Sequence, residues 1–169
     1  MAKRDDGGEL ETIDGSGHRF LVIEAPYYSV VAARLIEGAS AEFDVANAAY
    51  DRVVVPGALE IPQALGRAMA AGLMTGAGAK YDGVVALGCV IRGETSHYDI
   101  VCNNANHWLM DLCIRNDIPL GNAILTVDSH EQAIVRASGG RRGKGGDAAR
   151  ACLSLVRLAK EFATWGEAN

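Results

Sequence analysis

The stretch GCVIRGETSHYD, residues 88–99, decides the fold of this chain. It continues an apolar run at residues 84–87, passes through a polar turn and opens a long amphipathic segment. This order predicts a buried strand, a short loop and the start of a helix. Ser96 fits the first position of a variant capping box, with Thr95 as a competing cap. Free N–H groups and the positive dipole end at such a helix start favour an anion beside His97, although most loops of this kind bind nothing.

Short apolar runs alternate with amphipathic segments along the rest of the chain. Four runs are predicted to form strands, at residues 20–23, 50–55, 83–91 and 122–127. Each run is followed by a segment whose apolar residues have helical spacing. Such alternation predicts an α/β protein, a three-layer α/β/α sandwich with a four-stranded, mainly parallel sheet in flavodoxin-like layering.

Two of the predicted helices carry a readable apolar stripe, and we expect both stripes to face the core. The helix after His97 places apolar residues three or four positions apart, at Val101, Ala105, Trp108 and Leu112. The last helix, predicted at residues 146–165, has the same spacing at Ala148, Ala151, Cys152, Leu155, Leu158, Ala159 and Phe162.

Length and charge limit the class of protein. The 169 residues suffice for one domain with a sizeable core. We expect the polar, glycine-containing residues 1–17 to form a flexible N-terminal arm, and residues 18–169 to form a single α/β domain. The net charge of −5 and the lack of a large basic patch argue against nucleic acid as a partner. No apolar run is long enough to cross a membrane.

The four cysteines form no CxxC pair and no spacing with histidine that is typical of metal ligands. They lie within apolar patterns, so we expect buried, reduced thiols, no bound metal and a cytoplasmic protein. The polar start of the chain, which lacks the apolar core of a secretion signal, agrees with that location.

Ligands of doubly wound sheets bind outside the carboxyl ends of the strands. The loops at residues 24–28, 56–60, 88–97 and 127–131 are therefore predicted to meet in one crevice. Arg92 in the third loop fits either a phosphate ligand or a structural arginine that is paired between the strand and the loop.

Other candidate residues each have a functional and a structural interpretation. Glu60 fits a ligand-binding acid, or a first-turn residue that complements the helix dipole. Tyr27 fits a ring that stacks on an aromatic ligand, or ordinary packing. Arg136 lies on a predicted short helix, where an arginine is usually solvated or paired. Lys144 lies in a glycine-rich linker that lacks the Ser or Thr of a Walker phosphate loop.

Taken together, four motifs resemble the lumazine synthase family, over nearly the whole chain from about residue 20 to residue 162. The motifs occur in the family's order and at family-like spacing, which makes the combination specific. They are PGALEIP at residues 56–62, GCVIRGETSH at 88–97, ILT at 124–126 with EQAIVRA at 131–137, and GKG at 143–145.

The resemblance implies a reaction. Members of the family condense 5-amino-6-ribitylaminouracil with 3,4-dihydroxy-2-butanone 4-phosphate, the penultimate step of riboflavin biosynthesis. The product is 6,7-dimethyl-8-ribityllumazine, and phosphate and water are lost. The enzyme is a transferase that works by imine formation, phosphate elimination and ring closure, and it needs no cofactor and no metal.

The resemblance also assigns roles by position. His97 matches the family's proton-transfer histidine, and Arg136 matches the arginine that binds the substrate phosphate. Glu94 and Thr95 match the loop that cradles that phosphate, and Tyr27 matches the aromatic residue that stacks on the pyrimidine. The remaining matches are Ala58, Leu59 and Glu60 for the ribityl chain, Cys89, Val90 and Ile91 for main-chain contacts with the pyrimidine, Asn122 for a position reached from a neighbouring subunit, and Lys144 for a basic residue near the phosphate.

The family assembles as pentamers with sites shared between neighbours, and some members form sixty-subunit capsids. The short linker at residues 137–144 is compatible with either assembly. The implied partners are two small molecules, the ribitylaminopyrimidine and the butanone phosphate, with riboflavin synthase as a candidate protein partner. Leu59 and Asn122 stand where phenylalanine is common, which leaves the side-chain role of Asn122 open.

Two alternatives stay open beside the synthase. One is a paralogue of the same fold that has low activity and binds flavin or forms a shell. The other is a flavodoxin-like FMN module, which the general α/β pattern allows. Residues 24–27 offer few hydrogen-bond donors for an FMN phosphate, which argues against the second alternative.

Overall fold

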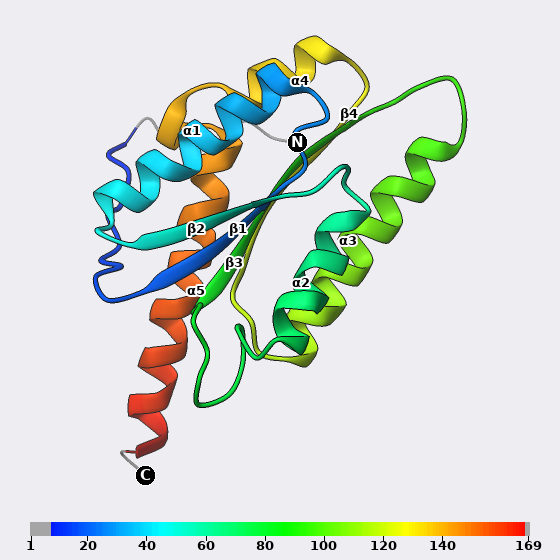
Figure 1. The fold of residues 1–169 in the computed structure, drawn as a ribbon. Helices are drawn as coiled ribbons and strands as arrows, with labels where there is room; N and C mark the ends of the chain where they lie inside the picture. The colour runs from blue at the N-terminus through cyan, green and yellow to red at the C-terminus, as the bar shows by residue number, and fades with distance from the viewer. Residues whose placement is uncertain (1–7, 168–169) are drawn as a thin grey trace.

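The computed structural model describes residues 8–167, which form a three-layer α/β/α sandwich around a parallel four-stranded sheet (Figure 1). The strand order is β2-β1-β3-β4. The strands are β1 (Arg19–Glu24), β2 (Ala49–Val54), β3 (Gly83–Ile91) and β4 (Leu120–Val127). The helices are α1 (Ser29–Val45), α2 (Glu60–Ala70), α3 (His97–Arg115), α4 (His130–Ala137), the 3₁₀ turn η1 (Gly140–Arg142) and α5 (Lys144–Glu167). The predicted fold class is confirmed.

The central strand β3 supplies both halves of the core, because successive side chains of a strand point to opposite faces. Val85 and Leu87 pack with α1, α4 and α5, whereas Val84 and Ala86 pack with α2 and α3. The first seven residues of β3 are buried, as the uninterrupted apolar run of a strand covered on both faces requires. Figure 1 shows α1, α4 and α5 on one side of the sheet and α2 and α3 on the other.

The core stripe predicted on α3 is largely confirmed, whereas the one predicted on α5 is largely wrong. On α3, Ala105 is buried and Val101 and Leu112 pack against the core, but Trp108 is 52% exposed. Leu109 and Cys113 complete the buried face of α3. On α5 the stripe is shifted by about one position, so that Leu155, Leu158 and Phe162 are exposed. The buried residues of α5 are instead Ala148, Ala149, Cys152, Leu153 and Val156.

Close packing between α5 and the sheet explains this shift. A Cβ on Gly121 of β4 would lie 2.0 Å from the carbonyl oxygen of Ala148. A Cβ on Gly83 of β3 would lie 2.6 Å from the sulfur of Cys152. Only small side chains fit between α5 and the strands there, so the larger leucine and phenylalanine side chains lie on another face of the helix.

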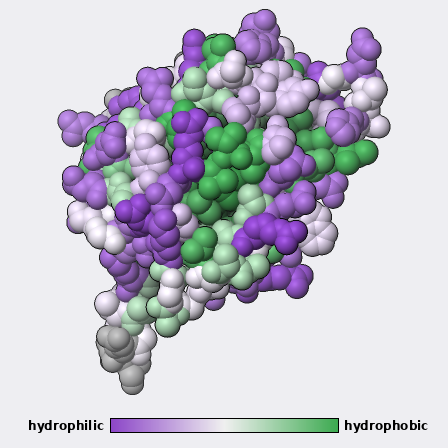
Figure 2. Space-filling model, in the orientation of Figure 1, coloured by the Kyte–Doolittle hydropathy of each residue, from purple (hydrophilic) through white to green (hydrophobic). Residues whose placement is uncertain are grey.

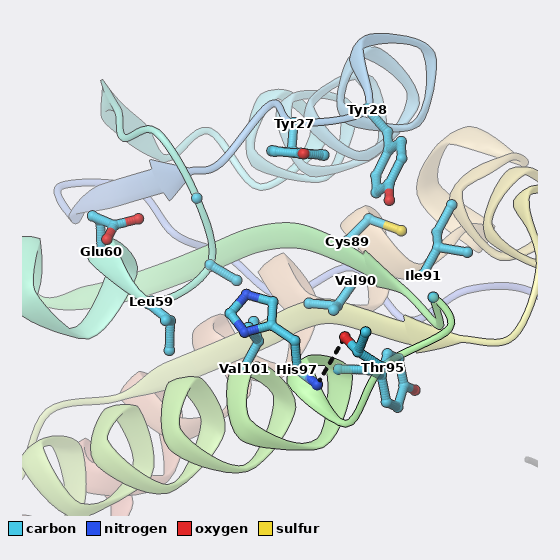
Figure 3. A pocket seen from close by; sticks show the side chains of 14 residues that line it. Tyr27, Tyr28, Leu59, Glu60, Cys89, Val90, Ile91, Thr95, His97 and Val101 are labelled. Carbon is cyan, nitrogen blue, oxygen red and sulfur yellow. Dashed lines mark hydrogen bonds between the residues drawn. The ribbon is translucent and has the colours of Figure 1, made fainter.

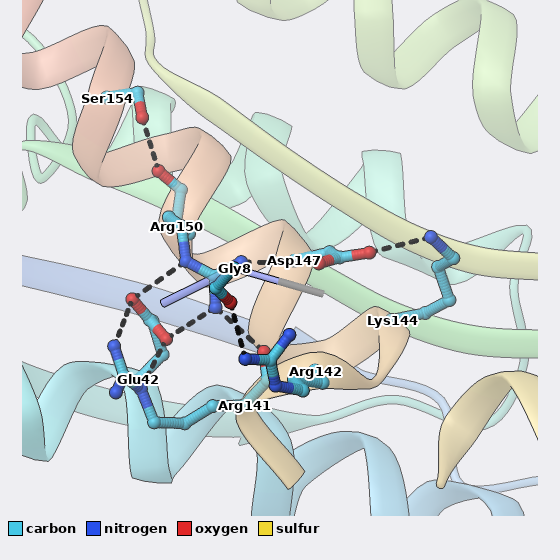
Figure 4. Close-up of polar contacts among 8 residues, drawn as sticks. All are labelled: Gly8, Glu42, Arg141, Arg142, Lys144, Asp147, Arg150 and Ser154. Carbon is cyan, nitrogen blue, oxygen red and sulfur yellow. Dashed lines mark hydrogen bonds and ion pairs between the residues drawn. The ribbon is translucent and has the colours of Figure 1, made fainter. Parts of the chain in front are cut away.

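A buried network of charged side chains joins α1, η1 and α5 (Figure 4). Glu42 of α1, 1% exposed, accepts hydrogen bonds from Nε and Nη2 of Arg150 at 3.1 and 2.7 Å. It also accepts a hydrogen bond from Nε of Arg141 at 2.8 Å. Arg150 Nη1 in turn donates to Asp147, which accepts a 2.6 Å hydrogen bond from Nζ of Lys144. The network therefore fixes the N-terminal end of α5 on α1.

We predict that the Glu42→Gln variant is destabilised by about 3–5 kcal/mol, because it removes the buried carboxylate that compensates the charges of Arg141 and Arg150. Urea unfolding at matched protein concentration measures this change. Glu37→Gln, on the exposed face of the same helix, is the matched control and should change the free energy of unfolding little. Equal stability of the two variants would show that the network does not stabilise the fold.

The predicted arm at residues 1–17 lies partly outside the described residues. Its described part, residues 8–17, forms no helix or strand but lies against the domain. Ile13 is 2% exposed within the core that includes α1 and α5. Backbone N–H of Gly15 donates to the carbonyl of Ala46 at 2.7 Å, and Arg142 donates to the carbonyl of Gly8 at 2.8 Å.

None of the helices within residues 8–167 has the length and hydrophobicity needed to span a bilayer. The same part of the chain contains no group of three or more histidine, cysteine or acidic side chains arranged to hold a metal ion. All four cysteines are unpaired, and Cys102 is half-buried while the other three are buried.

Candidate active site

A pocket of about 330 Å³ opens at the carboxyl ends of β1 and β3 (Figure 3). Three of the four predicted loops supply its walls, the loops after β1, β2 and β3, together with the start of α3. Its lining residues are Tyr27, Tyr28, Gly57, Ala58, Leu59, Glu60, Cys89, Val90, Ile91, Gly93, Thr95, His97, Tyr98 and Val101.

His97 is the first residue of α3, and Figure 3 shows its imidazole at the pocket wall between Leu59 and Val90. Its backbone N–H donates to Oγ1 of Thr95 at 3.4 Å. The predicted capping box is wrong, because Ser96 has helical backbone angles and its side chain caps no N–H group. Thr95, the competing cap, takes the N–H of His97 instead, and the N–H of Asp99 donates to the carbonyl of Ser96 at 3.0 Å. The positive end of the helix dipole still faces the pocket, where it favours an anion.

The loop after β2 brings Ala58, Leu59 and Glu60 into the pocket. Gly57 and Ala58 accept backbone hydrogen bonds from Glu60 and Ile61 at 3.1 and 3.2 Å, so the loop closes as a tight turn into α2. Glu60 lies in the first turn of α2, where a carboxylate complements the helix dipole. Since Glu60 also lines the pocket, its interpretation as a ligand-binding acid and its interpretation as a residue that complements the helix dipole are compatible.

Two adjacent aromatic rings form the wall contributed by the loop after β1. The rings of Tyr27 and Tyr28 meet edge to face, with centroids 5.1 Å apart. Tyr27 is 73% exposed, so one face of its ring is free to stack on a planar ligand. Tyr28 is half-buried, and burial raises the pKa of its phenol.

Cys89 contributes apolar surface rather than a reactive thiolate. Burial raises the pKa of the Cys89 thiol to about 11, and the neighbouring Cys102 adds to the shift. The thiol therefore stays protonated near neutral pH, and protonated thiols are poor nucleophiles. Cys89, Val90 and Ile91 lie at the end of β3, where main-chain groups can face a ligand.

Tyr98 and Val101 are lining residues that our sequence interpretation missed as site residues. Tyr98 follows His97, and Val101 lies four positions after it, one helical turn further along α3. The helical spacing of these residues from His97 could have identified them as site residues. It did not do so because Val101 fits an ordinary core stripe equally well.

Arg92 is paired rather than free. Its guanidinium donates to Asp99 at 3.3 Å and to Asp128 at 3.2 Å, and these two acids raise the pKa of Arg92, with Asp99 having the larger effect. Of its two interpretations, the structure supports the arginine that bridges strand and loop.

Four predicted site residues do not line the pocket of the single chain. Glu94 is exposed in the loop before α3, and Asn122 of β4 donates to Asn106 of α3 at 2.7 Å. Arg136 of α4 donates to the carbonyl of Gln132 at 3.2 Å, and Lys144 is paired with Asp147. The fourth predicted loop, after β4, stays outside the pocket, although the ring of His130 lies 6.4 Å from that of Tyr28.

Comparison with known proteins gives the family. Residues 17–160 match the family model for 6,7-dimethyl-8-ribityllumazine synthase. The chain belongs to the 6,7-dimethyl-8-ribityllumazine synthase family. It is 47% identical over 150 residues to the synthase of Nitrobacter hamburgensis, covering 89% of this chain and 91% of that protein. It is 48% identical to 6,7-dimethyl-8-ribityllumazine synthase 1 of Rhodopseudomonas palustris over the same shares of the two chains.

A third member of the lumazine synthase family, from Agrobacterium fabrum, is 49% identical over 142 residues, 84% of this chain and 95% of that protein. These matches confirm the resemblance that the four motifs indicate. The matched range contains every element that lines the pocket, so the whole of the described pocket lies within the family's part of the chain.

Proposed function

We propose that this chain condenses 5-amino-6-ribitylaminouracil with 3,4-dihydroxy-2-butanone 4-phosphate to form 6,7-dimethyl-8-ribityllumazine. The observation that carries this proposal is the pocket of a lumazine synthase family member in which His97, Thr95, Tyr27 and Glu60 face one cavity. The reaction needs an aromatic platform, a polyol site, a proton-transfer group and an anion site. The pocket offers a residue suited to each.

His97 is the proposed proton-transfer residue, because imidazole exchanges protons near neutral pH. It lies where the start of α3 meets the pocket, beside Thr95 and the positive end of the helix dipole, which suits a phosphate. Tyr27 would stack on the pyrimidine, and residues 58–60 would hold the ribityl chain. With both substrates held in a reactive pose, positioning supplies much of the rate enhancement.

We infer that a second copy of the chain completes the site. Arg136, Asn122 and Lys144 lie outside the pocket of their own chain, although each matches a substrate-binding position of the family. Arg136 forms no ion pair with an acidic side chain among residues 8–167, so its charge is available to a phosphate. In this arrangement the pocket and its arginine come from neighbouring subunits.

Exposed apolar side chains support the association of several copies. They lie on the edge strand β2 (Val53, Val54), on α3 (Ile100, Trp108, Ile114) and on the distal half of α5 (Leu155, Leu158, Phe162, Trp165). Figure 2 shows apolar side chains gathered over the sheet between α1 and the pair of α2 and α3. Large exposed apolar surfaces usually mark interfaces. We propose a pentamer, either alone or as the building block of a sixty-subunit capsid that holds riboflavin synthase as its partner.

Two measurements test these proposals. The increase in absorbance from lumazine, when both substrates are mixed with the purified protein, tests the activity. No increase above the uncatalysed rate would contradict it. Light scattering on the same sample separates a pentamer from a capsid, and a single subunit would contradict the shared site.

The activity assay also separates the synthase from a flavin-binding or shell-forming paralogue. Such a paralogue would assemble without turning over, whereas His97 and Thr95 in the pocket support turnover. We further infer a cytoplasmic location, which the four unpaired cysteines support because reducing compartments preserve free thiols.

A further inference from the structure

Arg92 follows the last residue of β3 and makes three side-chain contacts. Its Nε donates to Oδ1 of Asp128 at 3.2 Å, and its Nη2 donates to Oδ1 of Asp99 at 3.3 Å. The guanidinium carbon lies 4.0 Å from the centroid of the Tyr98 ring, a cation–π contact with a residue that lines the pocket. Arg92 thus joins the end of β3 to the first turn of α3 and to the loop after β4.

The contacts continue from Arg92 into α4. The backbone N–H of Arg92 donates to the carbonyl of Val127 at 2.9 Å. The N–H of Asp128 donates to Oε1 of Gln132 at 3.1 Å, and the carbonyl of Gln132 accepts from Nη1 of Arg136 at 3.2 Å. One chain of contacts therefore runs from the loop beside His97 to Arg136.

These contacts make Arg92 a poor direct ligand for a phosphate. Its single positive charge is shared between two carboxylates, so the cluster of Arg92, Asp99 and Asp128 has a formal charge of about −1. A second anion near this cluster would be repelled by the acids. The planar fork of arginine is, however, suited to bridging two acids in a fixed geometry, which a lysine cannot do.

We propose that Arg92 is a positioning residue for phosphate recognition, which fixes residues 93–97 against the loop after β4 before the substrate binds. This inference rests on the proposed function, because it takes Thr95 and the start of α3 as the phosphate end of the site. Binding to a loop that is already ordered costs less free energy than binding to a loop that the ligand must order. The KM for the butanone phosphate therefore depends on Arg92 more than kcat does.

The test compares Arg92→Gln, Asp128→Asn and the double variant with the wild-type protein. Each single variant should raise the KM for the butanone phosphate about three- to ten-fold, since half-exposed ion pairs are weak, and leave the KM for the pyrimidine almost unchanged. The double variant should be no worse than the more affected single variant, because both changes break the same contact. Arg92→Lys should restore only part of the affinity.

Arg115→Gln is the matched control. Like Arg92, Arg115 is an exposed arginine that is paired with an acid, Asp111 at 2.7 Å, but it lies at the far end of α3. This variant changes the net charge equally and should leave both KM values unchanged. If Arg115→Gln raises the KM for the phosphate substrate as much as Arg92→Gln does, general charge explains the effect and the proposal is overturned.

The outcome for Asp128→Asn separates positioning from direct binding. If Arg92 bound the phosphate itself, removing an acid would leave the KM unchanged or lower it. That result, or equal effects of Arg92→Gln on both substrates, would overturn the proposal.

Calorimetric titration with inorganic phosphate keeps this test independent of the reaction. If the wild-type protein forms no lumazine, the proposed function fails, and phosphate binding still tests Arg92. We expect Arg92→Gln and Asp128→Asn to weaken phosphate binding together, whereas Arg115→Gln does not. Unchanged phosphate affinity in both variants would contradict the role of Arg92 whatever the turnover.

Discussion

The His97→Ala variant is expected to form lumazine roughly 10²- to 10⁴-fold more slowly than the wild-type protein, the usual loss for an essential proton-transfer group. Turnover should nevertheless stay above the uncatalysed rate, because the pocket still holds both substrates together. The effect should fall on kcat, with modest changes in both KM values. Steady-state kinetics, followed by the absorbance of lumazine, measures all three.

His107→Ala is the matched control, since His107 is an exposed histidine of the same helix and does not line the pocket. It should leave kcat within about two-fold of the wild-type value, as surface substitutions usually do. Wild-type turnover in His97→Ala would remove the imidazole from the mechanism. Complete loss of activity with unchanged substrate binding would contradict a mechanism that depends mainly on positioning.

The Arg136→Ala variant should raise the KM for the butanone phosphate by roughly 10- to 100-fold, because a hydrogen bond to a charged group contributes about 1.5–3 kcal/mol. The KM for the pyrimidine should change far less. Arg136→Lys should recover part of the affinity, since it keeps the charge but loses the fork geometry. The two KM values are measured separately, each with the other substrate saturating.

Arg67→Ala, an exposed arginine on α2, removes the same charge outside the pocket and should affect neither KM value. An equal rise of both KM values in Arg136→Ala would show that the residue supports the assembly rather than the phosphate. An unchanged KM for the phosphate substrate would exclude Arg136 from the site.

The fold was predictable because β3 carries an unusually clear signal. Residues 83–91 are predicted as a strand and observed as β3 with the same bounds, since a strand buried on both faces needs an uninterrupted apolar run. Glycine and proline also mark the ends of the neighbouring elements. Ser129 caps α4 by accepting the N–H of Gln132 at 3.3 Å, as its position before that helix indicates.

The orientation of α5 was not predictable in the same way. On α5 the sequence contains two overlapping apolar stripes, and the one with the larger side chains, which includes Leu155 and Phe162, is exposed in the single chain. A stripe that faces a second copy has the same spacing as one that faces the core. What separates the two stripes is the close approach of Gly121 to Ala148, which depends on the tertiary structure.

The residues of the candidate site also fall into two groups, those that the sequence could bring to the pocket and those that it could not. Residues close together in sequence at strand ends, such as Leu59, Glu60 and His97, line one pocket as expected. Arg136 and Lys144 lie on elements that follow β4 and contact other groups in the single chain, so the sequence of one chain could not bring them to the pocket. Their role depends on how copies assemble.

Mixing the two impaired variants tests the shared site most directly. His97→Ala chains keep Arg136, and Arg136→Ala chains keep His97, so equal numbers assembled together should restore about one quarter of the wild-type sites, because each site takes its two halves from neighbours at random. We predict lumazine formation well above that of either variant alone. A mixture of either single variant with the double variant, which lacks both His97 and Arg136, should show no such gain. If the mixture is no more active than the average of its two components, His97 and Arg136 do not act across a subunit boundary, and the proposed shared site is contradicted.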